Sequence, residues 1–397
     1  LFIENVSALS VVKKYGSPTY CYSLNKLEKN ILKFKNNFKS VNPLICFSVK
    51  SNNNLEILKI IKNYNLGADV VSKGELLIAL KAKIPANKIV FSGVGKTNEE
   101  INFAIDRNIL LINAESESEI KSIIKIANKK KKNVNIGIRL NPNVDALTNN
   151  KISTGRKIDK FGVDKIQFKK LLKKYKFSKY FKIKCLSVHI GSQITDFKPY
   201  IKMVDEINNF LAKTDHKFDF IDFGGGMGIQ YNEKGKALNY KKYMKYIEKF
   251  LKKNDVKIIL EPGRSIVGDS AILLSKIIYI KETKKINFII LDAGMNDLVR
   301  PALYGSMHRI IPLIKKNKFK KKIHNFVGPV CETTDQFLSL VKYYKISEGD
   351  YVSICDVGAY GMVLTSNYNL RTKPAEVIVD RSISKLITRR QKLKNII

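Results

Sequence analysis

Eight short apolar segments, each followed by an amphipathic stretch, constrain the fold of this chain more than any other feature of its sequence. Within a segment the apolar residues are nearly continuous, which is typical of strands buried on both faces. The segments are 44–50, 68–72, 88–93, 110–114, 135–141, 184–190, 218–224 and 257–263. Helical periodicity separates them, as in 53–64, 73–83, 116–130 and 240–253. Eight strand–helix units in succession predict an α/β fold, a (β/α)8 TIM barrel.

The texture of the sequence changes after residue 263, where strand-like runs separated by turns replace the helical pattern. These runs are 271–282, 287–295, 324–331, 350–361 and 375–380. A chain of 397 residues also exceeds what one hydrophobic core usually serves. We therefore expect a barrel domain at 22–263 and a second, β-rich domain, a sandwich or barrel-like structure, formed by 1–21 and 264–397. The run 18–24 is expected to be a strand that enters the barrel.

The net charge of +37, from 72 Lys and Arg against 35 Asp and Glu, raises the possibility of a polyanionic partner. Only ten of these cations are Arg, and the Lys residues are spread over every expected helix. No nucleic-acid-binding motif accompanies them. We interpret the charge as a lysine-rich solvated surface and expect no specific nucleic-acid partner, while salt-sensitive binding to polyanions remains the alternative.

Five widely spaced cysteines, Cys21, Cys46, Cys185, Cys331 and Cys355, form no CxxC or Cys/His pattern. A disulfide framework and a metal site are therefore not expected. The first residues lack the basic and apolar regions of a signal peptide, and no apolar run reaches about 18 residues. We expect a cytoplasmic protein with no membrane partner.

Polar residues close several of the expected strands, and catalytic groups of TIM barrels lie at those strand ends. Lys50 ends the first strand, where burial would favour a free, nucleophilic amine. Arg139 lies on the fifth strand, and His189 follows the sixth. The alternatives are a surface lysine at Lys50 and a hydrogen-bonded core histidine at His189.

The last two strands end in a glycine turn and a carboxylate. The backbone of 224–226, Gly-Gly-Gly, can approach a phosphate closely, although a tight turn alone explains such a run. Glu261 on the eighth strand would be a buried carboxylate that needs a cation. A protonated pyridine nitrogen would serve, and an ion pair with Arg264 or Arg139 is the alternative.

Six motifs together resemble the signature series of the diaminopimelate decarboxylases, within the alanine-racemase-like, fold-type III group of pyridoxal-phosphate enzymes. They are FSVKSN (47–52), HIGSQITD (189–196), DFGGGMGI (222–229), EPGRSIVG (261–268), GPVCETTDQF (328–337) and DVGAYGM (356–362). Ser51 and Met227 depart from the usual residues of this family, at positions without a reactive role. The resemblance extends in order over nearly the whole chain.

The resemblance implies the cofactor pyridoxal 5'-phosphate, bound covalently by Lys50, with His189 packed on its ring. The implied cofactor-binding residues are Lys50, His189, Ser192, Gly225, Gly226, Glu261, Pro262, Gly263, Arg264 and Tyr360. The implied substrate-binding residues are Arg264, Arg300, Tyr304, Glu332 and Tyr360. The implied catalytic residues are Lys50, His189 and Cys331, the proton donor. Cys331 and Glu332 would come from the partner subunit of a homodimer.

The implied reaction is decarboxylation of meso-2,6-diaminopimelate to L-lysine, the last step of lysine biosynthesis. The nearest rival is an ornithine or arginine decarboxylase of the same fold, whose substrates lack the remote carboxylate that Arg300 would bind. An amino-acid racemase would need a second base. A non-catalytic pyridoxal-phosphate carrier would have no use for a β-rich domain.

Overall fold

A computed structural model describes residues 1–231, 238–316 and 319–397 of the chain. The chain divides into two compact units. The barrel unit comprises 31–229 and 236–265, and the β-rich unit comprises 1–30, 230–235 and 266–397. Among the described residues, none of the helices combines the length and the apolar character that a membrane crossing needs.

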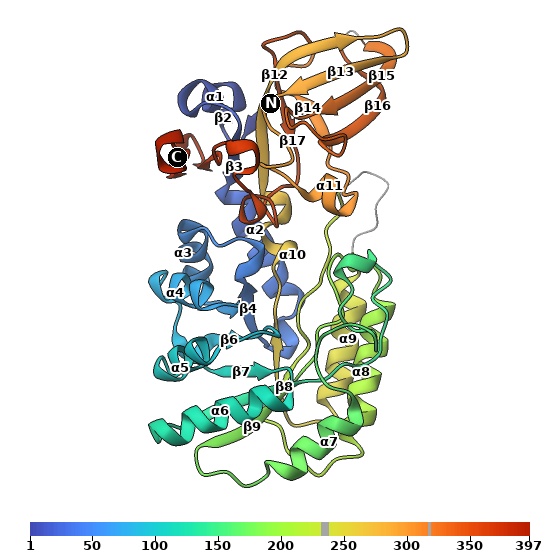
Figure 1. Cartoon of the computed structure of the whole chain (residues 1–397). Coiled ribbons are helices and arrows are strands. Elements are labelled where there is room, and N and C mark those ends of the chain that lie inside the picture. The colour runs from blue at the N-terminus through green and yellow to red at the C-terminus, as the bar shows by residue number, and fades with distance from the viewer. Residues whose placement is uncertain (232–237, 317–318) are drawn as a thin grey trace. The chain divides into compact units, whose positions relative to one another are not determined.

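The barrel unit contains eight parallel strands that close on themselves in the order β10-β11-β4-β5-β6-β7-β8-β9 (Figure 1). The strands are β4 (Leu44–Ser48), β5 (Gly67–Val70), β6 (Ile89–Phe91), β7 (Leu111–Ala114), β8 (Val134–Arg139), β9 (Phe181–Ser187), β10 (Phe220–Asp222) and β11 (Lys257–Leu260). Each overlaps one of the eight apolar segments of the sequence. The predicted TIM-barrel fold is therefore confirmed.

Helices alternate with these strands and lie outside them (Figure 1). They are α2 (Leu24–Asn37), α3 (Leu55–Asn63), α4 (Lys73–Lys81), α5 (Asn98–Asp106), α6 (Glu117–Lys130), α7 (Lys165–Lys174), α8 (Lys198–Leu211) and α9 (Tyr240–Leu251). Side-chain caps fix several helix starts. Thr97 and Glu100 form a capping box at α5, and Ser116 accepts a hydrogen bond from the backbone of Glu119 at α6.

The β-rich unit is built on a nine-stranded sheet whose main path is β16-β15-β13-β12-β3-β18-β19, with β17 joining β12 to β14. The strands are β3 (Thr19–Ser23), β12 (Ala271–Glu282), β13 (Ile286–Leu291), β14 (Ile310–Pro312), β15 (Phe319–Val327), β16 (Gln336–Tyr344), β17 (Tyr351–Ile354), β18 (Ala375–Asp380) and β19 (Ile383–Thr388). The strand expected at 18–24 is present as β3, which pairs with β12 and β18 of this sheet and leads directly into α2.

Short elements complete the β-rich unit: β1 (Phe2–Ile3), β2 (Val6–Ser7), α1 (Ala8–Tyr15) and α11 (Arg300–Tyr304), while α10 (Arg264–Val267) follows the last barrel strand. Helix α1 packs Val11 and Val12 against Leu274 and Val377 of the sheet. This apolar cluster explains why the first residues of the chain belong to the β-rich unit.

The barrel interior is a packed core, with one apolar cluster formed by Cys46, Val90, Leu111, Cys185 and Ile259 from five of the eight strands. Cys46 and Cys185 are fully buried and act as small apolar side chains. All five cysteines are free, and Cys331 alone among them is exposed.

Candidate active site

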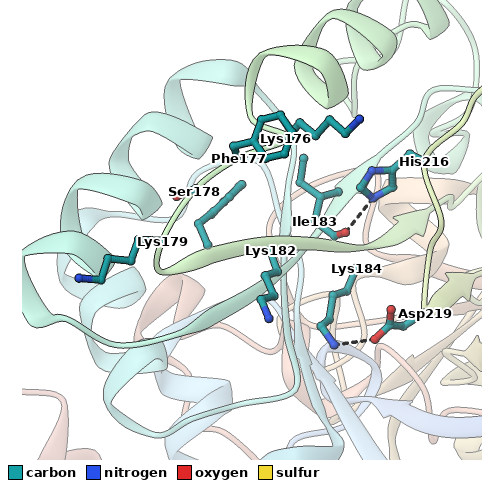
Figure 2. Close-up of a pocket in the computed structure, with 10 residues that line it drawn as sticks. Lys176, Phe177, Ser178, Lys179, Lys182, Ile183, Lys184, His216 and Asp219 are labelled. Carbon is teal, nitrogen blue, oxygen red and sulfur yellow. Dashed lines mark hydrogen bonds and ion pairs between the residues drawn. The ribbon is translucent and has the colours of Figure 1, made fainter.

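A surface hollow of about 740 Å³ lies at the amino end of β9 (Figure 2). Its polar contacts are between Lys184 and Asp219, at 2.6 Å, and between His216 Nε2 and the Ile183 carbonyl oxygen, at 2.9 Å. Figure 2 shows that Lys179 and Lys184 point in different directions. The hollow has no convergent polar groups, so the opposite ends of the barrel strands are the better candidate.

Lys50 lies at the carboxyl end of β4, in a single 3₁₀ turn (Val49–Ser51). Its Nζ is 2.6 Å from Oδ2 of Asp69 on the neighbouring strand β5, and Ser48 Oγ donates to the same oxygen at 2.5 Å. The Asp69 side chain is completely buried, whereas the Lys50 side chain is 32% exposed. The amine is therefore held by a carboxylate inside the barrel and still accessible from the barrel mouth.

His189 follows β9 and turns its ring toward the glycine turn. Its Nδ1 accepts a hydrogen bond from the backbone N–H of Gly225 at 3.0 Å, so the proton of the neutral ring lies on Nε2. Burial lowers the pKa of His189 well below its usual value, and the positive charges of Lys50 and Arg139 lower it further. The structure therefore holds a neutral imidazole of one tautomer at this strand end.

The glycine turn after β10 requires glycine for two reasons. Gly224 and Gly226 have φ values of +64° and +89°, which L side chains rarely adopt. A Cβ on Gly225 would lie 2.0 Å from the carbonyl oxygen of Glu261, and one on Gly226 would lie 2.1 Å from that of Gly191. The turn is therefore a backbone cradle that no larger residue can form.

Glu261 follows β11 and is 5% exposed, and its Oε1 has no hydrogen-bond partner among the described residues. Burial raises the pKa of Glu261 well above its usual value, and the nearby Asp222 and Asp69 carboxylates raise it further. An unpartnered, buried carboxylate oxygen is costly unless a cation or donor meets it. A protonated pyridine nitrogen fits this requirement, so these residues suit a pyridoxal group.

Among the described residues, neither of the two arginines considered as partners is hydrogen-bonded to Oε1 of Glu261. Arg139 Nη1 donates to Glu115 Oε1 at 2.9 Å, and Arg264 Nη2 donates to Ser192 Oγ at 3.0 Å. These contacts bring Ser192 and Arg264 together, as two of the expected cofactor-binding residues. The neighbouring Pro262 carbonyl accepts from the Ser48 N–H at 3.0 Å. A Cβ on Gly263 would lie 2.8 Å from Ser51 Oγ, so this strand end is also tightly packed.

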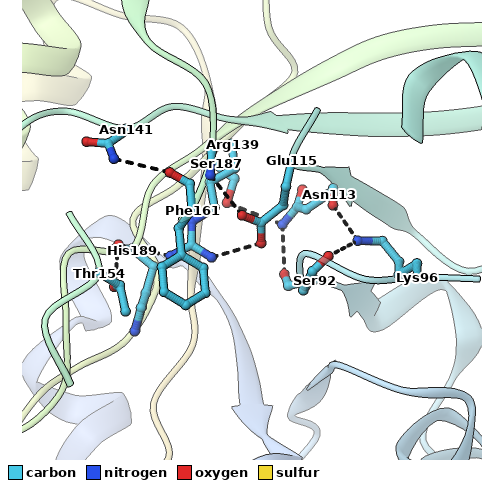
Figure 3. Close-up of polar contacts among 12 residues, drawn as sticks. Ser92, Lys96, Asn113, Glu115, Arg139, Asn141, Thr154, Phe161, Ser187 and His189 are labelled. Carbon is cyan, nitrogen blue, oxygen red and sulfur yellow. Dashed lines mark hydrogen bonds and ion pairs between the residues drawn. The ribbon is translucent and has the colours of Figure 1, made fainter. Parts of the chain in front are cut away.

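A polar network behind His189 was not predicted from the sequence (Figure 3). Arg139 Nη2 and Thr154 Oγ1 donate to the His189 carbonyl oxygen at 3.1 and 2.9 Å. Glu115, which pairs with Arg139, also accepts from the backbone of Gly162 at 2.9 Å. The network fixes the backbone at the end of β9, and it therefore also fixes the position of the His189 imidazole ring.

Asp222 at the end of β10 was also missed. It accepts hydrogen bonds from the Gly224 N–H at 2.9 Å, from Asn113 Nδ2 at 3.2 Å and from Ser187 Oγ at 3.3 Å. Burial raises its pKa to about 6. The available signal was a carboxylate inside an apolar run, which Asp69 and Asp222 share.

The remaining expected site residues lie in the β-rich unit. Arg300 begins α11 and is 3% exposed, and Tyr304 ends that helix. Tyr360 follows β17 with a φ of +56°. Cys331 and Glu332 are exposed: Cys331 Sγ accepts from Asn369 Nδ2 at 3.4 Å, and Glu332 is hydrogen-bonded by Tyr368.

A closed (β/α)8 barrel with a strand-end lysine, a glycine cradle and a buried strand-end carboxylate, followed by a β-rich unit, defines a pyridoxal-dependent decarboxylase. The family model "Pyridoxal-dependent decarboxylase, pyridoxal binding domain" matches residues 24–268. The diaminopimelate decarboxylase of Aquifex aeolicus is 40% identical over 398 residues, covering 98% of this chain and 93% of the relative. That of Haemophilus influenzae is 39% identical over 399 residues, covering 100% and 96%.

Solved structures agree with these relatives. Diaminopimelate decarboxylase from Helicobacter pylori, complexed with L-lysine, has a TM-score of 0.92 at 38% identity and covers 98% of both chains. The enzyme from M. jannaschii, also in complex with L-lysine, has a TM-score of 0.94 at 34% identity and covers 100% of this chain and 94% of the other. The chain belongs to the diaminopimelate decarboxylase family and is a carboxy-lyase, which confirms the resemblance seen in the sequence.

Proposed function

We propose that the chain binds pyridoxal 5'-phosphate and decarboxylates meso-2,6-diaminopimelate to L-lysine and CO2, the last step of lysine biosynthesis. The observation that carries the proposal is Glu261, whose buried Oε1 has no partner among the described residues. The full-length similarity to diaminopimelate decarboxylases and the lysine-bound structures of two relatives support the choice of substrate.

In this proposal Lys50 binds the cofactor covalently and the residues of the strand ends hold it. Gly225, Gly226 and Tyr360 bind the phosphate, and His189 packs on the ring. Ser192 and the stretch 261–264 complete the cofactor site. When bound, pyridoxal phosphate supplies an electron sink for the electron pair released as the carbon–carboxylate bond breaks.

The chain's own residues would then control protons and orientation. Glu261 keeps the pyridine nitrogen protonated, because that cation is what its buried carboxylate lacks. His189 is neutral, so it adds no positive charge beside the ring. Asp69 holds the Lys50 amine at the barrel mouth whenever that amine is not bound to the cofactor. Cys331 is proposed to return a proton to the substrate carbon.

The β-rich domain is proposed to supply the substrate and dimer contacts. Arg264, Arg300, Tyr304, Glu332 and Tyr360 would bind the two charged ends of the substrate. Cys331 and Glu332 would enter the site from the partner subunit of a homodimer, a role supported by their exposure. We also propose a cytoplasmic location, in keeping with five free cysteines.

The test combines a visible absorption spectrum of the purified protein with a product assay. We expect an absorption band of protein-bound pyridoxal phosphate, and release of equal amounts of CO2 and L-lysine from meso-diaminopimelate. A bound cofactor without lysine formation would contradict the substrate and leave the class standing. Absence of cofactor binding after addition of pyridoxal phosphate would contradict the whole proposal.

A further inference from the structure

Within the described part of the β-rich unit, the side chains of Tyr231, Ser306 and His308 contact Arg300. Its Nε donates to His308 Nε2 at 3.3 Å, and its Nη2 donates to Ser306 Oγ at 3.2 Å. The guanidinium carbon lies 5.1 Å from the ring centre of Tyr231, a cation–π distance. We call Tyr231, Ser306 and His308 the Arg300 clamp. Its contacts fix both the position and the plane of the guanidinium group.

The chemistry of the clamp determines the state of His308. Arg Nε carries a hydrogen and no available lone pair, so His308 Nε2 must accept. The ring is then neutral, and its Nδ1–H donates to the carbonyl oxygen of Cys355 at 2.8 Å. A proton on Nε2 would break the contact and place two cations side by side. One tautomer of His308 therefore satisfies both neighbours.

The clamp lies beside two paired strands of the sheet, β14 and β17. His308 is 1% exposed and precedes β14, while Cys355 follows β17, the strand that pairs with β14. The backbone N–H of Cys355 also donates to the Arg309 carbonyl oxygen at 2.9 Å. Tyr231 packs edge-on against His308, with ring centres 5.1 Å apart. His308 thus links the Arg300 side chain to the backbone beside β14 and β17, and the position of Arg300 depends on these two strands.

We infer that His308, together with Ser306, is a positioning residue for Arg300 and sets the plane in which that arginine bonds a carboxylate. This inference rests on the proposed function, in which Arg300 binds the carboxylate at the unreacting end of the substrate. A guanidinium reads a carboxylate bidentately through a planar fork, so its selectivity depends on a fixed plane. A histidine that only filled the core would affect stability and not this recognition.

The two nitrogens of His308 can be separated by substitution. In His308→Asn the amide replaces Nδ1 and can still donate to Cys355, but it does not reach Arg300. In His308→Gln the longer side chain can place a carbonyl oxygen near the position of Nε2 and accept from Arg300. Ser306→Ala removes the second acceptor from a half-buried site with little risk to folding.

The readout is inhibition of the holoenzyme by L-lysine and by cadaverine, which is lysine without its carboxylate. In His308→Asn we expect the inhibition constant for L-lysine and the KM for meso-diaminopimelate to rise about tenfold, the size expected for one hydrogen bond to a charged group. The inhibition constant for cadaverine and kcat should stay within about twofold. His308→Gln should recover most of the loss, and Ser306→Ala should weaken L-lysine alone by about threefold.

Arg300→Ala, measured in the same series, separates the inference from the proposed function. If Arg300→Ala weakens binding of L-lysine and cadaverine equally, Arg300 does not bind the carboxylate, and both the proposed role of Arg300 and the positioning role of His308 fail, while the proposed reaction is tested separately by lysine formation. If Arg300→Ala weakens L-lysine alone while His308→Asn leaves it unchanged, only the positioning role is overturned. Should His308→Asn not fold, an unchanged inhibition constant for L-lysine in Ser306→Ala overturns the clamp.

Discussion

Lys50 and Asp69 form an ion pair between two neighbouring barrel strands, and Nζ of Lys50 lies 2.6 Å from Oδ2 of the completely buried Asp69 side chain. The pair joins the ends of neighbouring strands β4 and β5 and directs the amine of a partly exposed lysine toward the strand ends. This position supports the proposed role of Lys50 as the residue that reacts with a carbonyl compound bound there.

Borohydride reduction of the holoenzyme, followed by peptide mapping, should attach the cofactor to Lys50. Lys50→Ala should give no labelled peptide and should lower activity at least about a thousandfold, since covalent catalysis is lost. Lys96 is the internal control, because it is a buried lysine that is ion-paired with Glu119 at 2.7 Å. Label on Lys96, or on another lysine, would refute the assignment.

Gly225→Ala should abolish tight cofactor binding, because the added Cβ would lie 2.0 Å from the Glu261 carbonyl oxygen and push the cradle away from the end of β11. The matched control is Gly95→Ala, where no atom lies within 4 Å of the new Cβ. Absorption titration with pyridoxal phosphate measures both. Equal affinity in the two variants would show that the cradle does not hold the cofactor.

Asp222→Asn should change the pH dependence of stability of the cofactor-free protein. Burial raises the pKa of Asp222 from 3.8 to about 6, so between these values the folded state binds more protons than the unfolded state. Stability of the wild type therefore falls as pH rises from about 4 to above 6, by at most about 3 kcal/mol from this group.

Asn does not ionise, so the unfolding free energy of Asp222→Asn relative to wild type should increase over the same pH window. Denaturant unfolding at pH 4, 5, 6 and 7 measures the difference. Glu75 and Asp297, whose pKa values burial raises to about 7, act equally in both proteins and cancel. The substitution also removes the influence of Asp222 that raises the pKa of Glu261, and this changes the difference in the same direction. A pH-independent difference would mean that the Asp222–Glu261 pair does not titrate in this range.

The eight barrel strands were predictable because parallel strands covered on both faces leave unbroken apolar runs. The strands β14, β16 and β19 were missed for the opposite reason. Strand β14 has only three residues, and most positions of β16 and β19 are exposed or half-buried, so neither of these two strands forms an unbroken apolar run. Strand β14 pairs with β17, which lies about 40 residues further along the chain, whereas β16 and β19 pair with the strands that precede them, β15 and β18.

The site was predictable where a single residue ends a strand, as Lys50 and Glu261 do. Contacts between side chains on two different strands were not predictable from the sequence. Asp69 and Lys50 are 19 residues apart, and Arg139 and Glu115 are 24 apart. Each of these contacts exists because two consecutive barrel strands pair side by side, β4 with β5 and β7 with β8. His308 gave no sequence signal at all, since its role depends on Arg300 and Cys355 together.

Mixing two inactive proteins should test whether the active site is shared between subunits. Lys50→Ala and Cys331→Ala, mixed under conditions of subunit exchange, should recover up to about a quarter of wild-type sites, from random pairing in a dimer. Half the dimers are then mixed, and each has one intact site. Mass spectrometry of labelled subunits measures the exchange. If subunits exchange and no activity returns, each active site is built within one chain.

Substrate selectivity should follow from Arg300. Meso-diaminopimelate has an amino-acid group at each end, so loss of CO2 at one end leaves a carboxylate for Arg264 and Arg300 and an ammonium for Glu332. Ornithine and arginine lack the second carboxylate. With either of them bound, the buried guanidinium N–H groups would have no carboxylate to donate to. Sites built to bond a polar group reject analogues without that group by roughly 10⁴ or more.

We therefore expect kcat/KM for meso-diaminopimelate to exceed that for ornithine and for arginine by at least about 10⁴. Arg300→Ala should lower activity on diaminopimelate without creating activity on lysine, because it removes binding energy and supplies no new contact. Steady-state assays of CO2 release from the three amino acids measure the ratio. Comparable efficiency on ornithine and diaminopimelate would overturn the proposed substrate, whereas the roles of Lys50 and Glu261 toward the cofactor would stand.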